Sequence, residues 1–369
     1  MIETSARIAF LRRIHLFYGL DDAELVAVAE QLEESPYAAG SVIFQQDTKA
    51  DSFYLIYSGS VKIVRKKEGK ESTLATLVRD DYFGEMALIE KRKRSGTCIA
   101  LTDTLLLVLS RDHFEKLLKN YPHLRLNFDV AVQSRHLAQT LQFKWLAPDE
   151  VIYFLARKHP VVLYRNLIVP IVCFAIPFLL IYAWLTMVKL SIVLLAAILS
   201  FVAVILWIIW LWIDWGNDYY IMTNKRVVWL EKVVGIYDSR LESPLSTILS
   251  VGVETEVLGR ALDYGNLSVR TFVGKIPFNH VSHPNEAQRM IEQYWNRSRE
   301  QAVGLEKEAM KNAIRRRLGI PIPAQPAPPP LKPAAHPKKR NAFSILRFLG
   351  ADTLRLRFEE GDTVVYRKH

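Results

Sequence analysis

One stretch, Leu167 to Ile213, constrains this chain most, because nearly all of its residues are apolar. The run from Leu167 to Val188 is long enough, at about 1.5 Å per helical residue, to cross the roughly 30 Å hydrocarbon core of a bilayer. Lys189 interrupts it, and a second run of similar length continues from Leu190 to Ile213. A single charge between two such runs leaves room only for a tight turn. The sequence therefore predicts a transmembrane helical hairpin over residues 167–213.

Basic residues gather on the flanks of the two apolar runs rather than in the turn. They are Lys144, Arg157, Lys158 and Arg165 before the first run, and Lys225, Arg226 and Lys232 after the second. Because Lys and Arg are enriched in the cytoplasmic flanks of membrane spans, we expect a cell-membrane protein with two spans and both termini in the cytoplasm.

The composition of the chain limits its partners. It has 369 residues and a formal net charge of +10, enough length for two or three domains. The basic excess suits a protein that faces anionic lipids, so we expect membrane lipids and not nucleic acid as a partner, with homodimerisation left open. The two cysteines, Cys98 and Cys173, indicate neither a disulfide framework nor a metal site.

Short apolar strands separated by glycines, with helices on either side, predict a β-roll with flanking helices over residues 1–147. Within it lies the run Phe83-Gly84-Glu85-Met86-Ala87-Leu88, followed by Arg94-Ser95. A compact cyclic phosphate needs backbone N–H groups that approach closely, which glycine allows, and a cation to neutralise it. Arginine provides paired charge-assisted bonds, and a nearby carboxylate can accept from a ribose hydroxyl.

This pattern resembles the phosphate-binding cassette of cyclic nucleotide-binding domains of the catabolite-regulator and protein-kinase regulatory type. The resemblance covers about residues 7–120 and continues less closely to 147. It implies a jelly-roll fold in which Gly84 and Ala87 give backbone donors, Glu85 meets the ribose, and Arg94 binds the phosphate. The segment Arg135–Thr140 is similar to the Arg-Arg-Leu-x-x-Thr of the bacterial regulators, which suggests a base contact. The implied ligand-contact set is Gly84, Glu85, Met86, Ala87, Arg94, Ser95 and Thr140.

The cassette departs from the family pattern at two positions. Lys93 replaces the usual proline, and Gln46 stands where a turn glycine is normal. Ser95 occurs in binders of both nucleotides, so the resemblance leaves the purine open. We expect cAMP or cGMP as the ligand and no cofactor.

After the second apolar run, the strands Tyr219–Met222 and Arg226–Glu231 flank Thr223-Asn224-Lys225 and predict a hairpin. More glycine-separated strands follow, and Pro284 opens a helix. Together with Gly259–Gly265, these motifs resemble bacterial PH-like domains, which implies a PH-like β-barrel with a C-terminal helix near lipid. We assign residues 214–300 to this domain and 148–166 to a juxtamembrane segment.

The remaining residues are assigned to connecting and terminal segments. Residues 301–340 combine a charged helix with a proline-rich linker. Residues 341–369 alternate around Glu359–Asp362 and predict a hairpin, whereas the shared Arg-Lys-His endings of 150–159 and 360–369 suggest the start of a truncated repeat.

Together these features predict a multidomain membrane protein that senses cAMP or cGMP and is not an enzyme, with no catalytic residues. An alternative is a membrane scaffold with a vestigial nucleotide pocket and a lipid- or protein-binding PH-like domain. A nucleotide-gated channel is less consistent with the sequence, because no selectivity-filter segment separates the two apolar runs.

Overall fold

The structure is a computed structural model that describes residues 2–67, 69–141, 143, 145–147, 150–186, 190–233, 237–272, 274–318, 357–360 and 363–366. The chain divides into two compact units, Met1–Glu308 and Ala309–His369. In the second unit, β16 (Arg357–Glu360) and β17 (Thr363–Tyr366) pair as an antiparallel hairpin. The turn expected at Lys189, the proline-rich linker and most of residues 341–369, where a truncated repeat is the alternative to the hairpin, lie outside the described residues.

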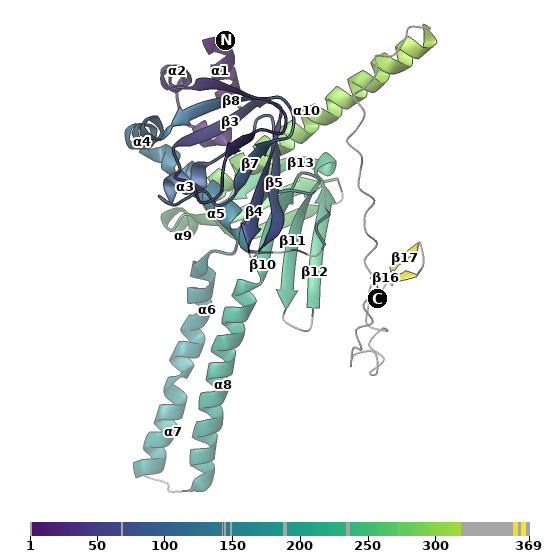
Figure 1. The fold of residues 1–369 in the computed structure, drawn as a ribbon. Coiled ribbons are helices and arrows are strands. Elements are labelled where there is room, and N and C mark those ends of the chain that lie inside the picture. Colours follow the sequence, from purple (N-terminus) through teal and green to yellow (C-terminus); the bar gives the residue numbers. More distant parts are fainter. Residues whose placement is uncertain are drawn as a thin grey trace. The chain divides into compact units, whose positions relative to one another are not determined.

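Two four-stranded antiparallel sheets form the predicted β-roll (Figure 1), in the orders β1-β8-β3-β6 and β2-β7-β4-β5. The strands are β1 (Glu33–Tyr37), β2 (Val42–Phe44), β3 (Ser52–Ser58), β4 (Ser60–Lys67), β5 (Lys70–Val78), β6 (Tyr82–Phe83), β7 (Thr97–Ala100) and β8 (Thr104–Ser110). Apolar side chains of the first sheet, such as Phe53 and Leu107, pack with Phe128 from a helix in one buried core. Burial of this apolar surface stabilises the roll.

Helices flank the roll as predicted. They are α1 (Thr4–Leu11), η1 (His15–Phe17), α2 (Asp22–Glu30), α3 (Glu85–Ile89), α4 (Arg111–Asn120) and α5 (Pro122–Thr140). Local chemistry fixes the start of α2. The Asp21 side chain accepts from the Glu24 N–H, and the Glu24 side chain accepts from the Asp21 N–H, both at 2.8 Å. This capping box satisfies two backbone donors that a helix start leaves without intrahelical acceptors.

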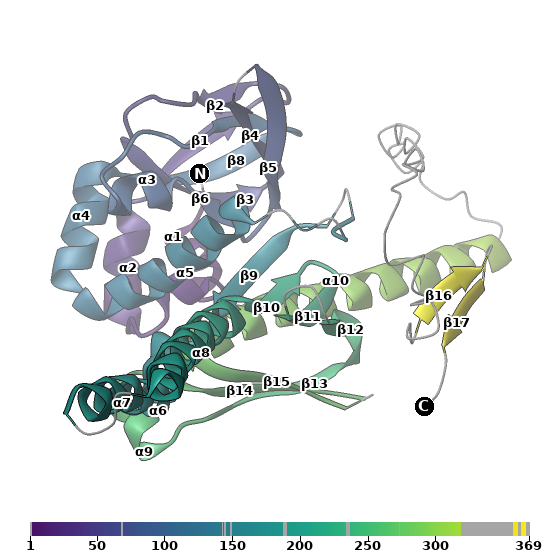
Figure 2. The same cartoon turned by 90° about the horizontal axis from the view of Figure 1, so that it is seen from below.

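The carboxyl-terminal part of the first unit has two sheets and a long helix. The strands are β9 (Ile152–Arg157), β10 (Asp218–Thr223), β11 (Arg226–Val233), β12 (Tyr237–Pro244), β13 (Ile248–Glu254), β14 (Tyr264–Thr271) and β15 (Lys275–Ser282), with η2 (Leu245–Thr247), α9 (Val257–Ala261) and α10 (Pro284–Arg317). The sheet orders are β12-β11-β10-β9 and β13-β14-β15. Figure 2 shows the two sheets facing each other. Tyr220, Phe278 and Met290, from the two sheets and α10, share one buried core.

One strand of this domain lies in a segment that the sequence assigned elsewhere. Residues 148–166 were predicted as a juxtamembrane connection, yet β9 lies within them and pairs antiparallel with β10, Tyr219 opposite Arg157. The domain therefore begins before the apolar hairpin and resumes after it. Both ends of the hairpin are held in neighbouring strands of one sheet.

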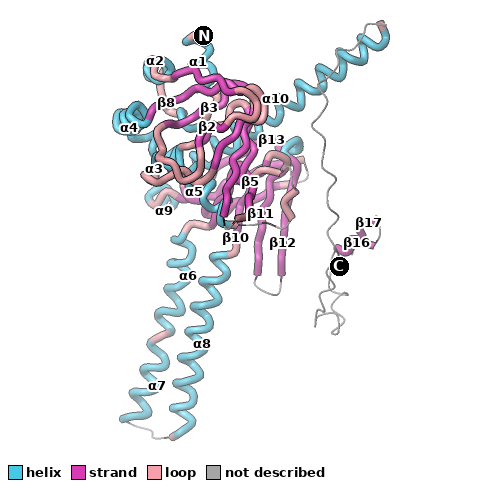
Figure 3. The backbone as a smooth tube through the Cα atoms, in the orientation of Figure 1, coloured by secondary structure: helices cyan, strands magenta, loops and turns pink. Residues whose placement is uncertain are grey.

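The apolar hairpin is formed by α6 (Pro160–Cys173), α7 (Ala175–Thr186) and α8 (Ser191–Gly216). Helices Pro160–Thr186 and Ser191–Gly216 are long and apolar enough to cross a membrane. Figure 3 shows a break between α6 and α7. Pro177 has no N–H to donate to the carbonyl of Cys173, four residues earlier, which accounts for a break at this point.

Candidate functional site

The predicted cassette lies where β6 ends and α3 begins. Gly84 joins them with a φ of 90°, a left-handed conformation that favours glycine. A Cβ at this position would lie 2.7 Å from Arg94 Nη1 and 3.1 Å from the carbonyl oxygen of Ser52. Gly84 is thus required both by its backbone conformation and by the close approach of the Arg94 side chain.

The side chain of Arg94 is held in a cage with 1% of its surface exposed. Its Nη1 donates to the Gly84 carbonyl at 2.9 Å, and its Nη2 donates to the Ser52 carbonyl at 2.7 Å and to Asp51 Oδ1 at 3.2 Å. The guanidinium also lies 4.3 Å from the centre of the Phe44 ring. Its Nε has no partner among the described residues. A buried cation with an unused donor is suited to receive an anion.

The Glu85 carboxylate is fully buried beside it. Its Oε1 accepts from Arg135 Nη1 at 2.6 Å, and Arg135 Nη2 donates to the carbonyl of Tyr82 at 2.8 Å. Burial is the largest single effect and lowers the pKa of Arg135, but Glu85, Tyr82, Tyr294 and Asp81 together raise it, so the net shift of the pKa is upward. The other oxygen, Oε2, lacks a hydrogen-bond partner within the described part of the chain. A buried acceptor left unpaired is costly, and a hydroxyl donor from a ligand would satisfy it.

A cavity of about 620 Å³ connects these groups, a size typical of small-molecule sites. Six of the seven predicted contact residues line it: Gly84, Glu85, Met86, Ala87, Arg94 and Ser95. Thr140 does not. Its side chain is exposed, and its hydroxyl donates to the carbonyl of Leu137 in the same helix at 3.0 Å. The preceding residue, Gln139, lines the cavity instead.

With this geometry established, two families match the chain. Residues 34–121 match the cyclic nucleotide-binding domain and residues 161–295 match the bacterial PH domain. This chain joins a cyclic nucleotide-binding domain to a bacterial PH domain. The second match begins at residue 161, so it covers the apolar hairpin and β10 to β15 but not β9, which the structure adds to the same sheet by its pairing with β10.

Relatives of the cyclic nucleotide-binding domain include kinases and regulators. The chain is 40% identical over 141 residues to cGMP-dependent protein kinase, isozyme 1, of Drosophila melanogaster (37% of this chain, 18% of the kinase). It is 32% identical over 136 residues to the cyclic AMP receptor protein of Thermus thermophilus (37% of this chain, 63% of that protein). The crystal structure of the Thermus thermophilus catabolite activator protein matches 34% of this chain and 59% of its own with 33% identity and a TM-score of 0.32. The chain thus covers less than two thirds of each relative.

Several residues that the sequence motifs did not single out complete the site of the cyclic nucleotide-binding domain. Arg94 donates to the carbonyl of Ser52, the first residue of β3, and to the side chain of Asp51 just before it. Arg135, which lies in α5, donates to Glu85. Arg135 lies in the same motif that suggested Thr140, so a signal was present. Which residue Arg135 binds depends on how α5 packs against the roll, and the motif alone does not predict this packing.

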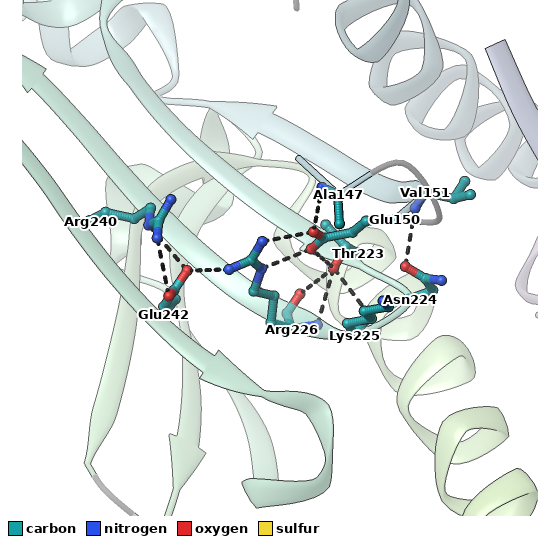
Figure 4. A network of polar contacts seen from close by, with 9 residues as sticks. All are labelled: Ala147, Glu150, Val151, Thr223, Asn224, Lys225, Arg226, Arg240 and Glu242. Carbon is teal, nitrogen blue, oxygen red and sulfur yellow. Dashed lines mark hydrogen bonds and ion pairs between the residues drawn. The ribbon is translucent and has the colours of Figure 1, made fainter. Parts of the chain in front are cut away.

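Residues of the segment that leads from α5 to the PH domain also line the cavity. Glu150 lines the cavity and is 5% exposed. Figure 4 shows that it binds the β10–β11 turn: Arg226 Nε and Nη2 donate to its two oxygens at 2.8 and 2.7 Å, and the Thr223 hydroxyl donates at 2.7 Å. Arg226 and Arg240 also lie over the Trp145 ring, at 5.1 and 5.2 Å. The segment after α5 is therefore fastened to the PH-domain sheet.

Proposed function

We propose that this protein is a membrane-anchored sensor of cAMP or cGMP, without catalysis of its own. The observation that carries the proposal is that Glu85, whose Oε2 has no partner among the described residues, lines the same cavity as the caged Arg94. A ribose hydroxyl would donate a hydrogen bond to Glu85 Oε2. A cyclic phosphate would accept hydrogen bonds from Arg94 and from the first N–H groups of α3. Relatives named for cGMP and for cyclic AMP support both nucleotides as candidates.

The apolar hairpin supports membrane anchoring. Its two helices have mean hydropathies of 2.5 and 3.2 in their most apolar windows. Large apolar side chains point outward, such as Val172 at 69% and Ile192 at 71% exposure. A continuous apolar surface of this length is stable in hydrocarbon and not in water. In this proposal membrane lipids surround the hairpin, and the basic flanks favour both arms in the cytoplasm.

The path from nucleotide to hairpin runs through α5 and β9. The Leu155 N–H of β9 donates to the Ser134 hydroxyl of α5 at 2.8 Å. Two residues after β9 ends, His159 accepts from the Val161 N–H and caps the start of α6. If nucleotide shifts α5, the strand that leads into the first apolar helix must adjust with it. A differential affinity of about 1–3 kcal/mol for the two arrangements is enough for such coupling.

Titration calorimetry of the full chain in nanodiscs with cAMP and then cGMP tests the proposal. We expect saturable one-site binding of at least one nucleotide, with 5′-AMP as the control that lacks a cyclic phosphate. Absence of heat with both cyclic nucleotides, confirmed by equilibrium dialysis, would favour the scaffold with a vestigial pocket.

A further inference from the structure

The face of α5 that meets the cavity is defined by three residues. Arg135, Ala138 and Gln139 all line it, at the spacings of three and four residues that place side chains on one face of a helix. Thr140 follows Gln139 by one residue, about 100° further round the helix, and is exposed to solvent. The helix phase therefore presents Gln139 to a ligand and not Thr140.

The Gln139 amide is held in one orientation. Arg65 Nη2 donates to its Oε1 at 2.7 Å, and because a guanidinium can only donate, the acceptor oxygen must face Arg65. Arg65 is itself fixed, since its Nε donates to the carbonyl of Ser95 at 3.0 Å. The Gln139 NH₂ group is left on the other side, where its one contact in the described structure is the Met86 sulfur at 3.6 Å. A thioether is a weak acceptor, so this NH₂ group remains available as a donor.

Gln139 is linked to the phosphate cassette on both sides, directly through Met86 and indirectly through Arg65, which donates to the carbonyl of Ser95. Met86 follows Glu85 in α3, and Ser95 follows Arg94. A ligand whose phosphate binds Arg94 and whose ribose binds Glu85 therefore extends its base past a cassette edge formed by Met86 and Gln139. The edges of purines offer ring-nitrogen acceptors, N7 among them, to which an amide NH₂ can donate.

We infer that Gln139, oriented by Arg65, is the residue that recognises the purine of a bound cyclic nucleotide. This inference rests on the proposed function and adds to it the side chain that forms a hydrogen bond with the base. Gln139 donates to an acceptor on the purine edge, and Arg65 acts as a positioning residue that prevents the amide from flipping. Because N7 is common to adenine and guanine, this contact selects for a purine and does not by itself choose between them.

The test compares two ligands on the full chain in nanodiscs: cAMP, and ribose 3′,5′-cyclic phosphate, which has the phosphate and sugar but no base. Gln139→Glu keeps an acceptor for Arg65 and removes the donor. Gln139→Leu removes the donor without adding charge. We expect each variant to bind cAMP about tenfold more weakly, the effect of losing one hydrogen bond to a desolvated partner, and to bind the base-free ligand as the wild type does. Thr140→Ala serves as the matched control and should leave both affinities unchanged.

The outcomes separate the two claims. Unchanged cAMP affinity in both Gln139 variants, or an equal loss for cAMP and the base-free ligand, would overturn the assignment of Gln139 while nucleotide binding itself stands. If the wild type binds neither cAMP nor cGMP, the proposed function fails, and the inference fails with it. Measuring the thermal midpoint of each variant identifies one that does not fold, and the other variant then decides.

Discussion

Asp81 of the cyclic nucleotide-binding domain and Arg297 of α10 form a buried ion pair that joins the two domains of the first unit. Arg297 Nη1 donates to Asp81 Oδ1 at 2.7 Å, and the aspartate is fully buried. Nearby, the Gln293 side-chain oxygen accepts from the His15 N–H at 2.7 Å. Asp81 lies directly before Tyr82, whose carbonyl binds Arg135. The pocket and α10 are thus connected through adjacent residues.

Asp81→Asn should destabilise the protein strongly, because Arg297 would remain buried without its counter-charge. Removing one partner of a buried pair costs about 3–5 kcal/mol. A thermal unfolding scan should show the midpoint lowered by about 10 °C. The matched control is Asp22→Asn, which breaks the exposed Arg12–Asp22 pair and should have little effect. Equal midpoints for the two variants would contradict a structural role for the buried pair.

Arg94→Lys should weaken cyclic nucleotide binding by about 30-fold or more. Lysine keeps the charge but lacks the planar fork that donates to the Gly84 and Ser52 carbonyls, so it cannot bind a phosphate through paired hydrogen bonds. Each lost hydrogen bond to a charged group costs roughly 1.5–3 kcal/mol. Calorimetry with cAMP measures the change. Arg92→Lys, on an exposed neighbour, is the control. Wild-type affinity in the Arg94 variant would show that the cassette assignment is wrong.

The buried His15 should make stability fall as the pH is lowered from 6.5 to about 4. Burial lowers its pKa from 6.5 to about 4, with Gln293, Arg135 and the ring of Tyr82 around it. The unfolded chain then binds a proton that the folded protein excludes, so this stability is present above pH 6.5 and is lost as the pH falls towards 4. His15→Gln should flatten the slope of the unfolding midpoint against pH in this window. If the slope in His15→Gln equals that of the wild type, other titratable groups cause the loss of stability in this pH range.

Nucleotide should change the distance between spin labels at Gln133 on α5 and Thr255 in the PH domain. The expected cause is movement of α5 against β9 and of the segment that Glu150 fastens to Arg226. Electron-paramagnetic distance measurements in nanodiscs, with and without saturating nucleotide, record it. Glu150→Gln weakens the bond to Arg226 and should reduce the change without abolishing binding. Identical distance distributions with and without nucleotide in the wild type, with binding confirmed, would show that nucleotide binding is not coupled to movement of the PH domain.

Cysteine labelling tests the topology that the basic flanks predict. In a background without Cys98 and Cys173, an impermeant reagent applied from outside should label a cysteine at Lys189. Cysteines at Asn120 or Glu300 should react only after the membrane is permeabilised. External labelling at either of these two positions would show that the predicted orientation is wrong.

The sequence by itself determined the features whose physics is local or compositional. The apolar runs 167–188 and 190–213 predict two spanning helices because helix rise and bilayer thickness fix the length required. The Gly84–Glu85 turn and Arg94 were identifiable because a close backbone approach and a paired cation need those residue types. The glycine-spaced strands likewise predicted the β-roll.

Only the tertiary structure decided which distant groups meet. The sequence could not pair β9 with β10, because the whole hairpin lies between them and a six-residue strand carries little signal of its own. It named Thr140 and not Gln139, because the packing of α5, rather than its motif, sets which face meets the cavity. Arg135 with Glu85, and Arg297 with Asp81, are charged residues whose partners follow from the fold. Long-range pairs of this kind depend on packing geometry, and no local pattern of residues encodes that geometry.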